Sequence, residues 1–167
     1  MKIGITMKQL LYSLVLSVLL VLPSTSKAQE KVDNIIFGIY CGHCSDHCAT
    51  LYSYSREDST TLYVDSTDSY FRRHDSPIVC RTPVHDRDKI QWVRHLIEDV
   101  PDDLLYGTER SRTFGCPDCS DACGIYVEFM HHQIKYRFYI DTQTSGFSEG
   151  MKSFAEEVKT VTGQLKK

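Results

Sequence analysis

The sequence predicts a small α+β domain in which an antiparallel β-meander carries two amphipathic helices packed on one face. Two observations predict this fold class. Several short segments rich in β-branched and aromatic residues alternate between apolar and polar positions, and two later segments repeat apolar residues every three or four positions. Each kind of element then has one apolar face that must be buried, so we expect strands and helices to share one core. No long linker or low-complexity tract interrupts residues 29–167, which we interpret as a single cysteine-rich domain.

The first half of this domain reads as strands. Residues 35–40 (I-I-F-G-I-Y) are apolar and partly β-branched and lead directly into a cysteine-rich segment. Residues 49–55 and 60–65 alternate and are rich in Tyr, Thr and Val, and turn residues at 57–59 separate them, so this pair is predicted to form a hairpin. Residues 76–81 predict another strand, whose proline fits a strand start or a sheet edge.

The periodicity changes to that of a helix after residue 85. Four apolar residues fall on one helical face: Ile90, Val93, Leu96 and Ile97. Asp86 or Asp88 is suited to cap the N-terminus of this helix, and Pro101 is suited to end it.

A second hairpin and a final helix complete the predicted domain. Residues 125–130 and 134–141 alternate strictly, and the turn between them is expected at residues 131–133. Ser148 then offers an N-cap for the last helix. The apolar face of that helix repeats at spacings of three and four residues and consists of Met151, Phe154, Ala155, Val158, Val161 and Leu165.

Residues 1–28 predict a cleaved signal peptide. Lysines precede an apolar run from Leu10 to Leu22, and a small-x-small cleavage site ends at Ala28. The run has 13 residues, fewer than the roughly 20 that a membrane-spanning helix needs. We therefore predict a periplasmic or secreted protein that begins at Gln29 and has no membrane span.

The charge of the predicted mature chain excludes one class of partner. Residues 29–167 contain 16 Lys and Arg against 22 Asp and Glu, a formal charge of −6. The basic pairs, at residues 72–73 and 166–167, are short and form no stripe that could follow a nucleic acid. The predicted partner is instead an unidentified protein or small ligand of the cell envelope.

Six of the seven cysteines lie in two similar octets. Residues 41–48 read C-G-H-C-S-D-H-C and residues 116–123 read C-P-D-C-S-D-A-C, so both follow the pattern C-x2-C-S-D-x-C. Each octet precedes a predicted strand, and we expect the two loops to meet at one end of the sheet. Cys80 stands outside the octets in an apolar run, and we interpret it as a buried, unreactive thiol.

Two structural interpretations of the octets remain open. One is a disulfide framework, in which each bridge adds ~2–4 kcal/mol to the stability of an exported domain. The other is a zinc site, because two C-x2-C pairs can direct four thiolates at one tetrahedral ion; the predicted cofactor is then one zinc ion, and otherwise none. Its four candidate ligands are Cys41, Cys44, Cys116 and Cys119. Further candidate ligands are His43, His47, Cys48 and Cys123. The C-P-D-C segment resembles the proline-containing knuckle of rubredoxin-like and zinc-ribbon sites.

A third interpretation is enzymatic. The C-G-H-C segment is similar to the dithiol of protein disulfide isomerases, and this resemblance implies that Cys41 and Cys44 are catalytic in a thiol–disulfide oxidoreductase or a redox sensor. The predicted elements disagree with a thioredoxin fold, which requires a β-α-β unit before the motif and a long helix after it. Only 12 residues of the predicted mature chain precede Cys41, and a turn and a strand follow. The sequence therefore favours a non-enzymatic interaction module that is stapled by disulfides or binds zinc. It does not indicate the ligand of this module.

Overall fold

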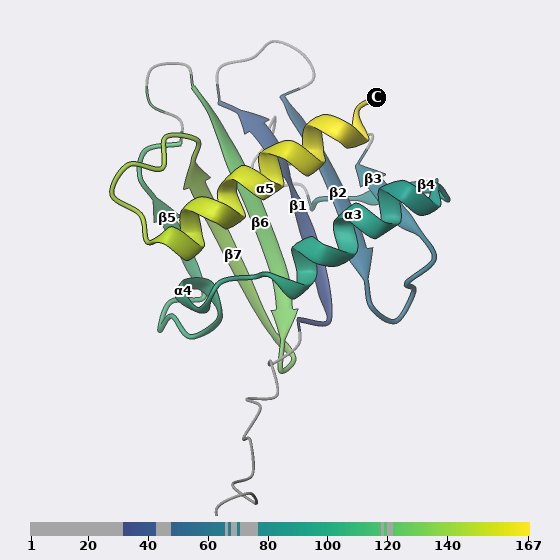
Figure 1. The fold of residues 1–167 in the computed structure, drawn as a ribbon, viewed down its shortest axis with the longest axis horizontal. Helices are drawn as coiled ribbons and strands as arrows, with labels where there is room; N and C mark the ends of the chain where they lie inside the picture. Colours follow the sequence, from purple (N-terminus) through teal and green to yellow (C-terminus); the bar gives the residue numbers. More distant parts are fainter. Residues whose placement is uncertain are drawn as a thin grey trace, which may run out of the picture. The chain divides into compact units, whose positions relative to one another are not determined.

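The central element of the structure is a mixed sheet, which has seven strands within the described residues, in the order β4-β3-β2-β1-β6-β7-β5 (Figure 1). The computed structural model describes residues 32–42, 48–65, 67, 70, 77–117, 119 and 122–167. The predicted signal peptide, residues 1–28, lies outside these residues. Among the helices that are described, none is long and apolar enough to cross a membrane.

The strands and helices have the following bounds. The strands are β1 (Asn34–Cys41), β2 (Ala49–Ser55), β3 (Leu62–Asp65), β4 (Cys80–Val84), β5 (Ser111–Phe114), β6 (Cys123–His131) and β7 (Ile134–Asp141). The helices are α3 (Arg87–Glu98), α4 (Asp102–Leu105) and α5 (Glu149–Leu165).

The predicted fold class, a small antiparallel meander with two helices packed on one face, is wrong. The first strand lies in the middle of the sheet, because β1 pairs antiparallel with β2 on one side and with β6 on the other. The edge strand β5 runs parallel to β7, which a meander does not allow. A parallel pair needs a crossover connection, and alternation within a strand does not reveal which distant strand it will pair with.

Most of the local predictions are confirmed. The hairpin of β2 and β3 forms around residues 56–60, and the helices α3 and α5 begin where Asp86 and Ser148 accept hydrogen bonds from backbone amides of the first turn. The strand predicted at 76–81 lies at Cys80–Val84 instead. The short elements α4 and β5 were not predicted, since four residues carry too little periodicity.

The hairpin of β6 and β7 is closed by a two-residue turn. His132 and Gln133 have φ angles of 50° and 63°, and His131 pairs with Ile134 on either side of them. Positive φ at both central residues is the geometry of a type I′ turn, whose twist matches that of the strands. The turn sets the register of the whole hairpin, which matters for the site below.

The main core lies between the sheet and the helices. Figure 1 shows α5 and α3 side by side in front of the sheet, with α5 crossing β1 and β6. Among the largest fully buried side chains of this layer are Phe37, Phe129, Phe138, Phe154 and Leu96. Because side chains alternate along a strand, the positions between these core residues point to the opposite face of the sheet. That face holds a second, smaller cluster: Tyr40, Leu51 and Tyr126, with Tyr70 and Tyr139 partly buried against them.

Candidate functional site: the cysteine loops and the tyrosine network

The two cysteine octets lie at the same end of the sheet, as predicted. The first octet connects β1 to β2, and the second leads from β5 into β6. Since β1 and β6 are antiparallel neighbours, the end of one meets the start of the other, and Cys41 stands directly opposite Cys123. These two residues form a disulfide between strands that are 82 positions apart in sequence. The chain is therefore a cysteine-rich module whose two octets are held together by a disulfide.

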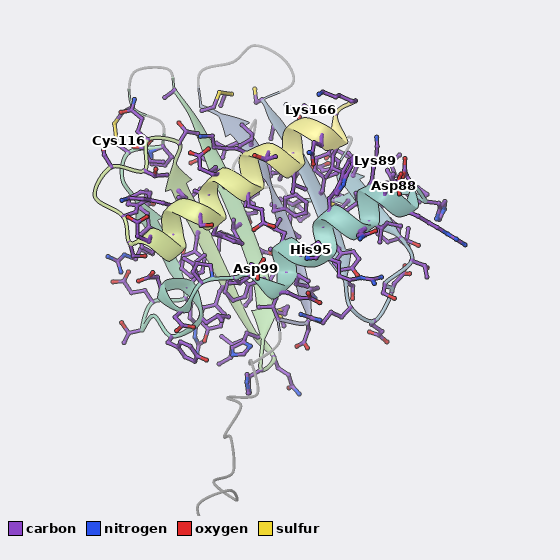
Figure 2. All side chains as sticks on the ribbon, viewed as in Figure 1. Asp88, Lys89, His95, Asp99, Cys116 and Lys166 are labelled. Carbon is purple, nitrogen blue, oxygen red and sulfur yellow. A yellow bond between two sulfur atoms is a disulfide. The ribbon has the colours of Figure 1, made fainter. Side chains whose placement is uncertain are left out.

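A second disulfide joins Cys116 to Cys119 within the C-P-D-C segment, and both of these cysteines are exposed. Cys48 also takes part in a disulfide. Cys80 is a free, partly buried thiol, which confirms that it is the unpaired cysteine of the described residues. Figure 2 shows Cys116 and the sulfur atoms at this end of the sheet.

The zinc and dithiol interpretations of the octets stay predictions. Cys44, which both interpretations use, and the further candidate ligands His43 and His47 lie outside the described residues. Within the described part of the chain, no group of three or more His, Cys, Asp or Glu residues could hold a metal ion. The sulfur of Cys41, which both interpretations use, is bonded to Cys123 in this structure.

Backbone contacts fix the ends of both loops. The amide of Cys41 donates to the carbonyl of Cys48 at 2.7 Å, which closes the base of the first loop. The amide of Cys116 donates to Asp141 Oδ2 at 2.8 Å, at the end of the neighbouring strand β7. Gly115 has a φ of 73°, and a Cβ atom there would lie 2.6 Å from the Cβ of Asp141, so only glycine permits this approach.

The second loop also packs against the first strand through a glycine. Gly124 stands opposite Tyr40, and a Cβ atom at Gly124 would lie 2.8 Å from the Tyr40 ring and 2.5 Å from the Cβ of Pro117. Because Gly124 has no side chain, the Tyr40 ring and the buried Pro117 of the second octet can both pack against its Cα atom. This contact joins the tyrosine face of the sheet to the cysteine end.

Replacing Gly124 with alanine should lower the free energy of unfolding by about 2 kcal/mol, because overpacking forces the ring and the proline apart. Urea unfolding of the variant measures this change. Gly163 provides the matched control: it lies in α5 with nothing near its missing side chain, so Gly163→Ala should stabilise by about 0.5–1 kcal/mol. Equal effects of the two substitutions would contradict the packing described here.

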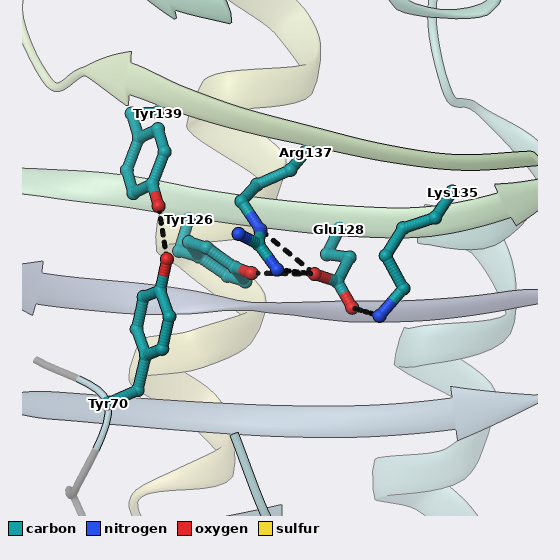
Figure 3. A network of polar contacts seen from close by, with 6 residues as sticks. All are labelled: Tyr70, Tyr126, Glu128, Lys135, Arg137 and Tyr139. Carbon is teal, nitrogen blue, oxygen red and sulfur yellow. Dashed lines mark hydrogen bonds and ion pairs between the residues drawn. The ribbon is translucent and has the colours of Figure 1, made fainter. Parts of the chain in front are cut away.

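A carboxylate with several partners lies at the centre of the tyrosine face (Figure 3). Glu128 is only 6% exposed. Its Oε2 atom accepts hydrogen bonds from the Tyr126 hydroxyl at 3.0 Å and from Nε and Nη2 of Arg137 at 3.0 and 2.9 Å. Its Oε1 atom lies 2.8 Å from Nζ of Lys135. Both oxygens of the buried carboxylate are thus paired with cations.

The phenols around this carboxylate extend the network towards the segment before β4. Tyr70 and Tyr139 share a hydrogen bond between their hydroxyl groups, and the Arg137 guanidinium lies 5.5 Å from the centre of the Tyr70 ring. The rings of Tyr126 and Tyr139 meet edge to face at 5.5 Å. Tyr70 is therefore attached to the sheet by a hydroxyl contact and a cation–π contact.

The electrostatics of this face keep its groups unreactive. Burial raises the pKa of Glu128, but hydrogen bonds from Lys135, Arg137 and Tyr126 lower it by more. The pKa of this carboxyl group therefore lies below its ordinary value. Burial and the neighbouring carboxylate raise the pKa of Tyr126. Burial, and after it the charges of Asp65 and Glu128, raise the pKa of Cys80 to about 12. The phenol and the thiol stay protonated at neutral pH and are poor nucleophiles.

The sequence interpretation missed this network, although a signal for it was present. Once the turn at residues 132–133 fixes the hairpin, Glu128 stands opposite Arg137, and Tyr126 stands opposite Tyr139. Opposite charges at directly paired positions stabilise a sheet face. The alternation alone identifies the core face, and the register of the hairpin is needed to pair the charges on the other face.

A G-x-S-x-G pattern at residues 146–150, which is also a serine hydrolase signature, was not recognised in the sequence. In the structure its serine caps a helix: Ser148 Oγ accepts a hydrogen bond from the Met151 amide and donates one to Asp103. No histidine is among the described residues that line the adjacent groove. In the described part of the chain, the role that the contacts show for Ser148 is that of a helix cap.

Two features of the molecule can indicate a function, the disulfide that joins the octets and the ion-paired carboxylate beside Tyr126. Relatives of known function do not add to them. The family models, the curated proteins and the solved structures with which the chain was compared give no match.

Proposed function

We propose that this chain is an exported, non-enzymatic binding module whose cysteine loops are fixed by disulfides. The observation that carries the proposal is the Cys41–Cys123 bond, which ties the two octets together across adjacent strands. Disulfides persist outside the cytosol, which agrees with the export predicted from residues 1–28. The partner in this proposal is a protein or a small ligand of the cell envelope.

Preorganisation explains what the disulfides contribute to binding. The contact between Cys41 and Cys48 closes the first loop, and Asp141 holds the start of the second. Loop ends that are fixed before a ligand binds lose less conformational entropy on binding, so more of the contact energy appears as affinity. The described ends of both loops are held together at one end of the sheet.

Thiol–disulfide exchange is the second candidate function, and a specific observation favours it. Cys116 and Cys119 form a disulfide with C-x2-C spacing and are both exposed, and exposed disulfides are the ones that react with thiols. In such an exchange a thiolate of a partner protein attacks one sulfur and the other leaves as a thiolate. A second thiol of the partner then releases the reduced pair, so the partner dithiol is oxidised.

Analysis of the protein isolated from its native cell envelope or medium distinguishes these functions. We expect an N-terminus at Gln29, peptides linked through Cys41–Cys123 and Cys116–Cys119 without prior reduction, and no turnover in an insulin-reduction assay. Retention of residues 1–28, or alkylation of Cys41 without a reductant, would contradict the proposal. Turnover that disappears in a Cys116→Ser, Cys119→Ser variant that remains folded would favour thiol–disulfide exchange.

A further inference from the structure

A cationic groove lies at the opposite end of the sheet from the cysteine loops. It has a volume of about 640 Å³, and its lining comes from the turn that joins β2 to β3 and from α3 with the residue His85 before it. Its lining consists of Ser59, Thr60, His85, Arg87, Ile90, Gln91, Arg94 and His95. None of the described residues that line it is acidic, although the predicted mature chain has a formal charge of −6.

Some arginines of the described chain form ion pairs, and others, including the two that line the groove, do not. Arg56, Arg112 and Arg137 each form an ion pair with a glutamate. Arg87 and Arg94, in contrast, form no ion pair with any described residue, and both are exposed. A guanidinium offers five donors in a rigid fork that matches a carboxylate, sulfate or phosphate group. Two unpaired guanidinium groups in one concave site are therefore two places for oxyanions.

Two carboxylates close to the groove in sequence, Asp58 and Asp86, accept hydrogen bonds from other groups. Asp58 accepts hydrogen bonds from the hydroxyls of Thr60 and Tyr63. Asp86 caps α3 by accepting from the amides of Asp88 and Lys89. These contacts hold both carboxylates in the two walls of the groove by hydrogen bonds of their own.

The helical spacing sets the distance between the two cationic positions. Arg87 and Arg94 are seven residues apart in α3, which is about 10 Å along a helix axis. His85 lies two residues before Arg87 in sequence, and His95 directly follows Arg94. Between them the groove is lined by Gln91 and by Ile90, which is only 5% exposed, with Ser59 and Thr60 on the opposite wall.

We propose that this groove binds a small elongated dianion, whose two carboxylate, sulfate or phosphate groups are about 10 Å apart and contact Arg87 and Arg94. The spacer of the ligand lies over Ile90 and between the polar groups of Gln91, Ser59 and Thr60. This second site lies at the opposite end of the sheet from the cysteine loops and goes beyond the binding module proposed above. The proposal uses none of the cysteines, so its failure would leave the disulfide connectivity and export unaffected and can be told apart from failure of the binding module.

Isothermal titration calorimetry of residues 29–167 at low ionic strength tests the proposal. The probes are decanedioate, a disaccharide with a sulfate at each end, the shorter hexanedioate and inorganic phosphate. We expect at least one of the two long dianions to bind about tenfold or more tightly than hexanedioate and phosphate, because only a long ligand reaches both arginines. The tighter of the two identifies an apolar or a saccharide spacer, and added salt should weaken it.

Single substitutions locate the site. Arg87→Ala and Arg94→Ala should each weaken the binding of the long dianion about tenfold or more and leave the melting temperature unchanged, since both side chains are exposed. Arg110→Ala, at an exposed arginine outside the groove, should leave the affinity unchanged. Long dianions that bind no better than phosphate, or binding that survives both groove substitutions, would overturn the proposal.

Discussion

Replacing Cys41 and Cys123 together with serine is expected to lower the free energy of unfolding by about 4.5 kcal/mol, the value that the chain-entropy relation gives for a loop of this length. The bond links residues 82 positions apart, so its loss frees most of the domain in the unfolded state. For a domain of this size the melting temperature should fall by roughly 15 °C. Thermal and urea unfolding of the double variant measure both quantities, and removing both cysteines leaves no new thiol.

The bond within the second octet provides the control. Cys116 and Cys119 are separated by only three positions, and the same relation gives about 2 kcal/mol for so short a loop. The Cys116→Ser, Cys119→Ser variant should therefore melt well above the Cys41→Ser, Cys123→Ser variant. The reverse order would show that the bond between β1 and β6 does not carry the stability of the cysteine end.

Local signals predicted the elements of this fold better than their arrangement. Asp86 and Ser148 were identifiable as helix caps because their side chains act within one turn of themselves. The pairing of β1 with β6 depends on a partner strand more than 80 positions away, and the alternation of β1 is equally compatible with many partners. The same holds for β5, which is only four residues long and joins the sheet through a parallel pairing.

The candidate site shows the same division. The repeated octets predicted that their cysteines would lie together, and the Cys41–Cys123 bond confirms this. The connectivity was not predictable, because it follows from strand register: Cys41 faces Cys123 only when β1 and β6 are neighbours in this alignment. The network around Glu128 depends only on the register of one hairpin. It could have been predicted from the sequence, because a two-residue turn at His132 and Gln133 places Glu128 opposite Arg137.

Removing the buried carboxylate is the second large effect that we expect. Glu128→Ala should lower the free energy of unfolding by about 3 kcal/mol, because it removes the carboxylate that accepts from the Tyr126 hydroxyl and forms the ion pair with Arg137. The side chains of Lys135 and Arg137 are 57% and 36% exposed, so water can hydrate them in the variant. The expected loss of stability is therefore at the lower end of the range for breaking a buried ion pair. Glu128→Gln can still accept from Tyr126 and should cost about half as much.

The pH dependence separates the charge of Glu128 from its volume. Hydrogen bonds from Lys135, Arg137 and Tyr126 outweigh burial, so the pKa of Glu128 is lower in the folded chain than in the unfolded one. Its contribution is therefore fully present above the ordinary glutamate pKa of about 4.3 and is lost as the pH falls through the folded-state value. The stability difference between the wild type and Glu128→Gln should be largest at neutral pH and shrink below about pH 4. Glu156→Gln, which removes an exposed ion pair with Lys159, should change stability by less than about 0.5 kcal/mol at any pH. A difference for Glu128→Gln that does not change with pH would mean that the carboxylate acts through packing alone, and the ion pairs on the tyrosine face would then contribute nothing to folding.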